Sequence, residues 1–174
     1  MSTDHELRLE DYLGRLYGYA MSLSQNHDDS KDLVQECALK ALGARNIPTQ
    51  HSAYRAWLFR ILRNAFIDKC RRRKVAETWV TDGTHLSSDN MEYFRGDERL
   101  INALSVKFEL AKLPTAQREI IGLIDAAGLS YEEAAELLNV PIGTVMSRIS
   151  RARHALVTAI NGSNVQGLPV KRRT

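Results

Sequence analysis

The spacing of apolar residues constrains this chain most, because helical periodicity recurs along most of the sequence and strand-like alternation is nearly absent. Apolar side chains three and four positions apart form one face of an α-helix, whereas a half-buried strand needs strict alternation. The pattern predicts helices over residues 9–23, 31–42, 54–74, 99–112, 115–127, 131–138 and 142–160. We therefore expect an all-α fold.

One stretch interrupts this pattern. Residues 78–97 are rich in glycine, serine and asparagine and show no sustained period, which is typical of a linker. A chain of 174 residues is long enough for two small domains. We expect two helical domains joined by a flexible linker, the C-terminal one a helix-turn-helix. The predicted boundaries are 1–76 for the N-terminal domain, 77–98 for the linker, 99–160 for the C-terminal domain and 161–174 for a basic tail.

Charge is distributed unevenly along the chain. Residues 54–74 hold eight basic residues and one acidic residue, and residues 130–174 hold six basic and three acidic. The segment between them, residues 75–129, has an acidic excess with five basic and nine acidic residues. Two positive blocks predict two contacts with a polyanion such as nucleic acid.

Several classes of protein do not fit the sequence. It contains no apolar run long enough to span a membrane and no signal peptide, so we expect a cytoplasmic protein without membrane insertion. Cys37 and Cys70 lack the spacing of metal ligands, and the histidines are scattered. We expect no metal, no cofactor and no catalytic residues, and therefore no enzyme.

Residues 130–156 carry the pattern of a helix-turn-helix. Ser130 and Glu133 form a capping box, and residues 139–141 form a tight turn before a second helix. That helix has one apolar stripe, made of Val145, Ile149, Ala152 and Leu156. Another face holds Thr144, Ser147, Arg148 and Arg151, whose side chains suit contacts with bases and phosphates. We predict DNA binding, against the alternative of a merely solvated face.

The segment from Tyr54 to Lys74 is both basic and aromatic. Leu58, Ile61, Leu62 and Ala65 form its inner stripe, and arginines lie largely on other faces. Aromatic residues are interleaved with the arginines: Tyr54, Trp57, Phe59 and Phe66. Positive charge beside aromatic rings is typical of binding to single-stranded nucleic acid, although some of these rings can equally belong to the core.

The helix over residues 31–42 has an unusual outer face. Its inner stripe is Leu33, Val34, Cys37, Ala38, Ala41 and Leu42. The opposite face holds Asp32, Gln35, Glu36 and Leu39, and a leucine among acidic residues indicates a protein-docking patch. A singly exposed leucine is also ordinary on protein surfaces, so both interpretations stay open.

These three segments resemble, in family order, parts of the sigma-70 superfamily of transcription initiation factors. Asp28–Leu42 resembles the polymerase-binding segment, and Ala53–Lys74 resembles the segment that melts and recognises the −10 element. Leu113–Leu156 is similar to the −35 recognition domain. The length fits the extracytoplasmic-function group, which keeps only these two domains. The amino-acid sequence of the last segment is similar to that of stress-response members of the group.

The resemblance implies a role for each face. It implies polymerase binding by Asp32, Leu33, Gln35, Glu36 and Leu39. It implies contacts with the opened −10 element by Tyr54, Trp57, Arg60, Arg63, Asn64, Arg71 and Arg72, with the loop of residues 43–52 helping Asn64 to hold a flipped base. It implies reading of the −35 duplex by Thr144, Ser147, Arg148, Arg151 and Arg153. The implied partners are core RNA polymerase, promoter DNA and an anti-sigma factor between the two domains.

Three other interpretations compete. An operator-binding helix-turn-helix regulator that acts without polymerase explains residues 113–160 but not the basic aromatic helix. A recombinase would need a nucleophile with basic partners, and Ser22, Ser24 and Ser30 show no such arrangement. A sigma-mimicking adaptor would normally carry a phosphoreceiver domain, whose βαβ pattern is missing from the sequence.

Overall fold

The computed structural model describes residues 2–79 and 106–162, with side chains from residue 8 to 75 and from 106 to 162. All regular structure within these ranges is helical, so the all-α prediction is confirmed. No helix within these ranges is both long and apolar enough to cross a membrane. The predicted linker, apart from residues 77–79, and most of the predicted tail lie outside the described residues.

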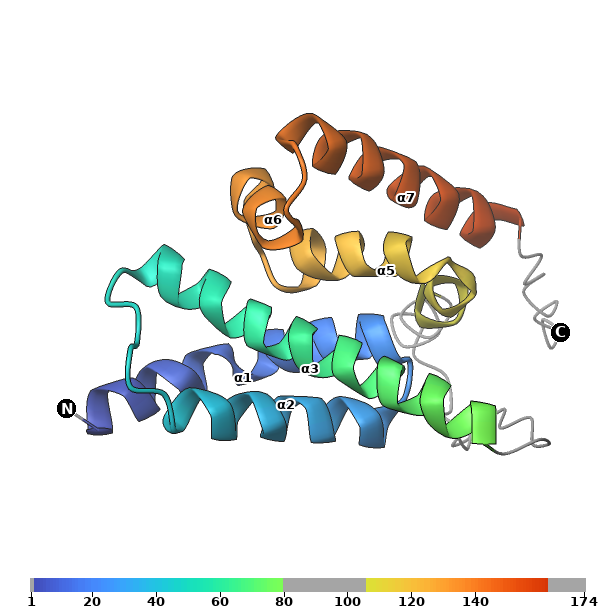
Figure 1. Cartoon of the computed structure of the whole chain (residues 1–174). Coiled ribbons are helices and arrows are strands. Elements are labelled where there is room, and N and C mark those ends of the chain that lie inside the picture. The colour runs from blue at the N-terminus through green and yellow to red at the C-terminus, as the bar shows by residue number, and fades with distance from the viewer. Residues whose placement is uncertain (1, 80–105, 163–174) are drawn as a thin grey trace, which may run out of the picture.

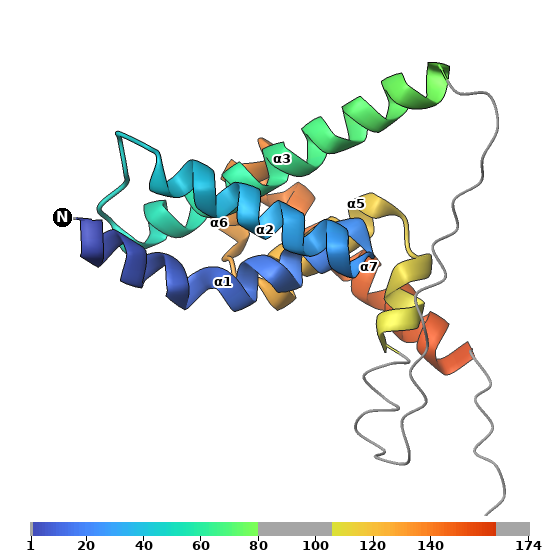
Figure 2. The ribbon, with the colours of Figure 1, turned by 90° about the horizontal axis from the view of Figure 1, so that it is seen from below.

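The N-terminal bundle consists of α1 (Ser2–Ser24), α2 (His27–Leu42) and α3 (His51–Trp79). Each helix runs antiparallel to the one before it, and α1 and α2 both pack against α3 (Figures 1 and 2). Their shared core includes six fully buried side chains: Leu16, Tyr19, Tyr54, Leu58, Phe59 and Leu62. Burial of this apolar area, at about 25 cal/mol per Å², is the main force that holds the bundle together.

α2 begins four residues earlier than predicted. We predicted that this helix begins at residue 31, but Asn26 caps it, since the Asn26 side-chain oxygen accepts the backbone N–H of Asp29 at 2.9 Å. Asp28 and Asp29 then fall in the first turn, where negative charge favours the helix N-terminus. The predicted start at residue 31 was therefore wrong, because residues 26–30 include several suitable caps and the first one, Asn26, is used.

α3 is longer than predicted at both ends. At its start, the backbone N–H of Tyr54 donates to the carbonyl of Gln50 at 2.8 Å, which brings residues 51–53 into the helix. At its end it passes residue 74 and reaches Trp79, because residues 75–79 contain neither glycine nor proline. The helix therefore extends beyond residue 76, the predicted end of the N-terminal domain.

The C-terminal unit consists of a helix described from residue 106 to 112, α5 (Thr115–Ile121), η1 (Gly122–Ala126), α6 (Tyr131–Leu138) and α7 (Ile142–Gly162). We expected one helix over 115–127, but its last turn is a π-turn, in which the Ala127 N–H donates to the Gly122 carbonyl at 2.8 Å. Gly128 ends it with a φ of +72°, a conformation that glycine adopts without strain. The helical structure thus ends at Ala126, one residue before the predicted end at residue 127.

The C-terminal unit packs directly on the N-terminal bundle. α5 and η1 contact α1, and α6 contacts α3 (Figure 1). Four side chains of the unit belong to the same buried cluster as the core of the bundle: Leu123, Ala127, Leu129 and Leu137. The two predicted domains therefore share part of one core. The sequence pattern predicted the two domains but not this contact between them.

Candidate nucleic-acid interface

The predicted helix-turn-helix is present in α6 and α7. Ser130 Oγ accepts the backbone N–H of Glu133 at 3.2 Å, and the Glu133 carboxylate accepts the Ser130 N–H at 2.7 Å, which confirms the capping box. Asn139 ends α6 in the left-handed conformation, with a φ of 54°. This sharp turn sends α7 away from α6 and leaves one face of α7 outside the core.

Three residues of the predicted apolar stripe of α7 are buried, with Val145, Ile149 and Ala152 at most 2% exposed, and the fourth, Leu156, is half-buried. On the other face Arg148 and Arg151 are exposed, whereas Thr144 and Ser147 are half-buried. Arg151 donates back to its own helix, to the carbonyl and the hydroxyl of Ser147, both at 3.2 Å. Arg151 and Ser147 are therefore joined on the outside of the helix-turn-helix, on the same helix as the exposed Arg148.

Arg153, the remaining residue of the predicted −35 contact, is paired with an acidic side chain. It donates to both carboxylate oxygens of Asp125, at 2.5 and 3.3 Å, and ties α7 to η1. Its hydrogen bond with Asp125 raises the pKa of Arg153 above the usual value. In this arrangement the Arg153 guanidinium group already has a carboxylate partner. To make the predicted phosphate contact, Arg153 would have to leave Asp125.

The aromatic side chains of α3 divide between core and surface. Tyr54 and Phe59 are fully buried, and the Phe59 ring meets that of Tyr19 edge-on, 5.6 Å between centroids. Trp57 and Phe66 are half-buried against the same core. Tyr54 cannot stack on a base in this arrangement, so of the two predicted aromatic contacts only Trp57 has exposed surface.

The arginines of α3 meet glutamates of the C-terminal unit at three places. Arg55 donates to the Glu133 carboxylate at 2.6 Å, and Arg63 donates to Glu119 at 2.7 Å. Arg60 lies 3.8 Å from Glu136, where both side chains are largely exposed. Sequence reasoning missed all three pairs, because the partners are 56 to 78 residues apart and follow no local spacing.

Glu133 has a lowered pKa within this arrangement. Burial alone would raise the pKa of its carboxyl group, but hydrogen bonds from Arg55 and from the Ser130 backbone outweigh that cost and hold it below the usual value. The charged form is therefore the stable one. A single carboxylate both caps α6 and binds α3.

The far half of α3 is held differently. Asp29, in the first turn of α2, accepts Lys69 Nζ at 2.8 Å and an Arg73 nitrogen at 2.6 Å. Burial opposes ionisation of Asp29, but these two hydrogen bonds prevail and lower its pKa. Lys69 and Arg73 thus fix α3 to α2, whereas Asn64, Arg71 and Arg72 remain on the exposed surface.

On the predicted outer face of α2, Asp32, Gln35 and Leu39 are exposed and Glu36 is half-buried. Leu39 is 72% exposed and the Asp32 side chain 71%, and Glu36 pairs with Lys40 at 2.7 Å on the same helix. Leu33 is 1% exposed and lies in the core, so its side chain cannot meet a partner here. Leu42 is 46% exposed, so its assignment to the inner stripe was wrong, and it enlarges the apolar part of the exposed face.

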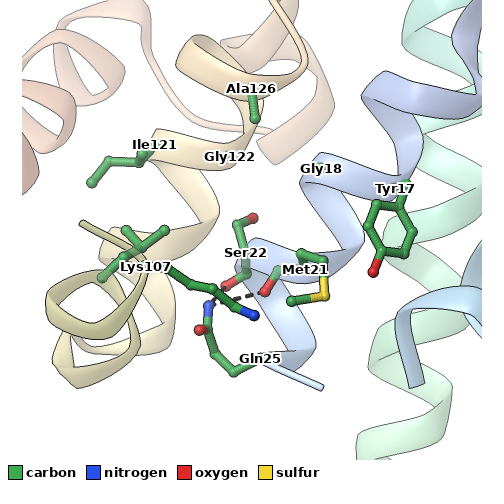
Figure 3. Close-up of a pocket in the computed structure, with 10 residues that line it drawn as sticks. Tyr17, Gly18, Met21, Ser22, Gln25, Lys107, Ile121, Gly122 and Ala126 are labelled. Atoms are coloured by element: carbon green, nitrogen blue, oxygen red, sulfur yellow. Dashed lines mark hydrogen bonds between the residues drawn. The ribbon is translucent and has the colours of Figure 1, made fainter. Parts of the chain in front are cut away.

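Three further features bear on chemistry. A pocket of about 340 Å³ lies between α1, η1 and residues 107–110; Tyr17, Met21 and Lys107 are among its lining side chains (Figure 3). Within the described residues no cluster of three or more histidine, cysteine or acidic side chains is suited to a metal. Burial raises the pKa of Cys37 to about 12, so this thiol stays protonated at neutral pH.

Comparison with known protein families assigns both units. The family described as Sigma-70 region 2 matches residues 9–75, and the family described as Sigma-70, region 4 matches residues 103–156. The first range spans most of α1–α3, and the second includes the helix-turn-helix up to residue 156 of α7. The two matches occur in the order expected from the sequence.

Individual relatives agree with this assignment. The chain is 38% identical over 141 residues to the ECF RNA polymerase sigma factor EcfG of Rhodopseudomonas palustris (strain TIE-1), covering 81% of this chain and 76% of the relative. It is 36% identical over 138 residues to the ECF RNA polymerase sigma factor SigC of Mycobacterium tuberculosis (strain CDC 1551 / Oshkosh), covering 78% and 72%.

A solved structure extends the likeness to the whole arrangement. The sigma factor RpoE from Bartonella quintana, solved in complex with the anti-sigma factor NepR, superimposes with a TM-score of 0.72 at 35% identity, over 92% of this chain and 98% of that one. The superposition therefore includes both helical units of this chain. The chain belongs to the extracytoplasmic-function group of sigma-70 RNA polymerase sigma factors.

Proposed function

We propose that this sigma factor uses three separate faces during promoter-specific initiation of transcription. The observation that carries the proposal is that one chain presents a capped helix-turn-helix with exposed Arg148 and Arg151 together with a second, basic and aromatic helix, α3. A protein that only binds duplex DNA needs the first of these but not the second. The proposal assigns duplex reading to α7 and single-strand reading to α3.

The face of α2 made of Asp32, Gln35, Glu36 and Leu39 is the proposed contact with core RNA polymerase. An exposed leucine surrounded by acidic and polar side chains suits a docking surface on another protein. The exposure of Leu39 and Leu42 supports this assignment, because folding of the chain itself does not use them. We leave Leu33 out of the contact, since it lies in the core.

For the opened −10 element we propose contacts from Trp57, Arg60, Arg63, Asn64, Arg71 and Arg72. Opening DNA and flipping a base costs a few kcal/mol, which contacts with the unpaired strand must offset. The exposed positions of Asn64, Arg71 and Arg72 support their role. Arg60 and Arg63 carry the same charge but are paired with glutamates in this arrangement.

For the −35 duplex we propose Thr144, Ser147, Arg148 and Arg151 as the reading residues, with Arg153 on a phosphate after exchange from Asp125. Arginine can bind guanine through two hydrogen bonds, each good pair giving about 1–3 kcal/mol of discrimination. Helix-turn-helix units in general lay their second helix in the major groove, which supports the choice of α7 as the reading helix.

The protein is further proposed to act in the cytoplasm, to catalyse no reaction itself and to be controlled by an anti-sigma factor. The last part is supported by the Bartonella quintana relative, which was solved with the anti-sigma factor NepR. Recovery of the chain from its native cells, followed by identification of the proteins bound to it, tests this part. Recovery of polymerase subunits alone would contradict control by an anti-sigma factor.

Run-off transcription with core bacterial RNA polymerase on a pool of promoter fragments tests the whole assignment. The protein is expected to produce new transcripts, which Asn64→Ala and Arg148→Ala abolish or strongly reduce. Arg15→Ala is the matched control, since Arg15 is an exposed arginine of α1 outside the proposed faces. Binding to duplex DNA without any transcript would instead favour a polymerase-independent regulator.

A further inference from the structure

Two aromatic rings lie side by side near the start of α3. Tyr54 and Trp57 are three residues apart, a spacing that places side chains on the same face of a helix. Their ring centroids are 5.6 Å apart, and the ring planes are inclined by 43°. Tyr54 is fully buried, whereas Trp57 is half-buried and keeps exposed surface. The pair therefore joins the core of the bundle to a ring that reaches the surface.

The helix α1 contacts the Tyr54 ring through two side chains. The guanidinium carbon of Arg8 lies over the face of this ring, 4.2 Å from its centroid. The ring of Tyr12 is 5.9 Å from it, at an angle of 56°. A cation over an aromatic face and an inclined pair of rings are both favourable arrangements. The Tyr54 ring is therefore held by another helix as well as by its own.

Arg8 and Tyr12 are in turn attached to the chain just before Tyr54. The Tyr12 side chain is buried, and its hydroxyl lies 2.8 Å from Nε2 of His51, the first residue of α3. Arg8 donates to the backbone carbonyl of Thr49 at 3.4 Å, in the loop that precedes α3. The two side chains of α1 thus bind the start of α3 and the Tyr54 ring together.

We propose that Tyr54 is a positioning residue for Trp57, and that Arg8 and Tyr12 hold Tyr54 in place for this purpose. The inference rests on the proposed contact between Trp57 and the opened −10 strand. A base that stacks on Trp57 then meets a ring that is already oriented. Binding is tighter in that case, because a side chain fixed beforehand loses less conformational freedom when its ligand arrives.

This proposal gives Tyr54 a different role from the one that the sequence suggested. A buried ring cannot itself stack on a base, but it can restrict the motion of the half-buried ring beside it. Phe59 offers a matched comparison, because it is also a fully buried aromatic residue of α3 but its ring meets Tyr19, at a centroid distance of 5.6 Å. Tyr54→Leu and Phe59→Leu each remove one buried ring from the same helix. Tyr54→Phe is the conservative variant, since it keeps the ring.

Two measurements separate positioning from general stability. In a Trp79→Phe background Trp57 is the only tryptophan of the chain, so time-resolved fluorescence anisotropy reports the motion of its ring in the full chain. Strand binding is measured with the same chain bound to core bacterial RNA polymerase, by titration of a dye-labelled non-template strand. The strand is taken from a promoter that the run-off assay selects. Urea unfolding followed by circular dichroism shows whether each variant is folded in both measurements.

The expected results differ between the two rings. Trp57→Ala should weaken strand binding about tenfold, a loss within the range for one stacked base. Tyr54→Leu should give Trp57 fast local motion and weaken strand binding about threefold, because the tryptophan ring is still present but must be ordered on binding. Tyr54→Phe and Phe59→Leu should leave both readings at the values of the unaltered chain.

Arg8→Gln is a second test, in case Tyr54→Leu does not fold. Arg8 lies in the first turns of α1 and is only half-buried, so its loss should leave the bundle folded. Arg8→Gln should change both readings in the same direction as Tyr54→Leu, by a smaller amount. Arg15→Gln is its control, because Arg15 is an exposed arginine of the same helix and the substitution removes the same charge.

Three outcomes would overturn the positioning role. The first is a folded Tyr54→Leu or Arg8→Gln variant in which Trp57 stays as ordered as before. The second is faster motion of Trp57 without weaker strand binding, and the third is an equal effect of Phe59→Leu. Failure of the proposed function gives a different result, since Trp57→Ala would then bind the strand as tightly as the unaltered chain or no promoter would be transcribed. That result would refute the contact of Trp57 with the strand and the positioning role with it.

Discussion

The guanidinium group of Arg55 donates to the Glu133 carboxylate at 2.6 Å, and the same carboxylate accepts the backbone N–H of Ser130 at 2.7 Å. The carboxylate therefore serves two helices, as the cap of α6 and as the partner of α3. Both side chains of the ion pair are largely buried, 18% and 15% exposed. Removal of one partner should accordingly destabilise the chain more than removal of one partner of a surface ion pair, because it leaves the other charge largely buried and uncompensated.

Substitution of Glu133 separates its two roles. Glu133→Gln keeps a side chain that can still cap α6 but removes the charge opposite Arg55, so the free energy of unfolding should fall by about 1–2 kcal/mol. Glu133→Ala removes the cap as well and should cost about 1 kcal/mol more. Urea unfolding followed by circular dichroism measures both losses. Glu132→Gln, at an exposed neighbouring position, is the control, and an equal loss there would refute the dual role.

The stability of the fold should depend on pH in the acid range. The pKa values of Asp29 and Glu133 are lowered in the folded chain, since hydrogen bonds to cations outweigh the effect of burial. A lowered folded pKa stabilises the protein fully above the unfolded pKa, about 3.9 for aspartate and 4.3 for glutamate. The denaturation midpoint should stay level from pH 7 to about 5 and fall below about 4.5. Glu133→Gln should flatten this fall, and an unchanged pH profile in that variant would contradict the assignment.

The two cysteines should differ in reactivity. Burial raises the pKa of Cys37 to about 12, whereas Cys70 is partly exposed. Because the thiolate is the reactive form, a thiol-specific reagent at pH 8 should modify one thiol in the native protein and two after unfolding. Cys70→Ser should abolish the native reaction. Rapid modification of two thiols in the native chain would show that Cys37 is not enclosed.

Leu39 and Leu33 lie on the same helix and should separate function from stability. Leu39→Ala should change the free energy of unfolding by no more than about 0.5 kcal/mol, because the side chain is 72% exposed. If α2 binds polymerase through this face, the variant should lower transcription and weaken binding to core polymerase. Leu33→Ala should instead destabilise the chain by about 2–5 kcal/mol, because Leu33 is buried. Full activity of a stable Leu39→Ala variant would remove Leu39 from the proposed contact.

Local signals in the sequence were enough to predict much of the fold. The Ser130–Glu133 capping box, the turn at Asn139 and the apolar stripe of α7 are each defined by residues within a few positions of one another. The start of α2 was missed for the opposite reason, since residues 26–30 offer several suitable caps and spacing alone does not choose among them.

Contacts between distant segments were not predictable in the same way. Arg55 and Glu133 are separated by 78 residues, and no periodicity connects them. The core also uses rings that the sequence pattern left undecided, because Tyr54 and Phe59 sit among arginines yet are fully buried. Whether each ring is buried depends on which other helices pack against α3. The sequence of α3 alone does not show where those helices lie.

α3 continues without a break from His51 to Trp79, a length of 29 residues. At about 1.5 Å per residue, such a helix is a rod about 43 Å long. Arg63 and Arg71 are eight residues apart, so their backbone positions are about 12 Å apart along the axis, a spacing that the intact helix preserves whether or not the C-terminal unit is in place. The distances between the arginines along α3 are therefore fixed by the helix itself. If α3 binds the opened strand as proposed, the length of strand that it can contact is determined before any DNA is bound.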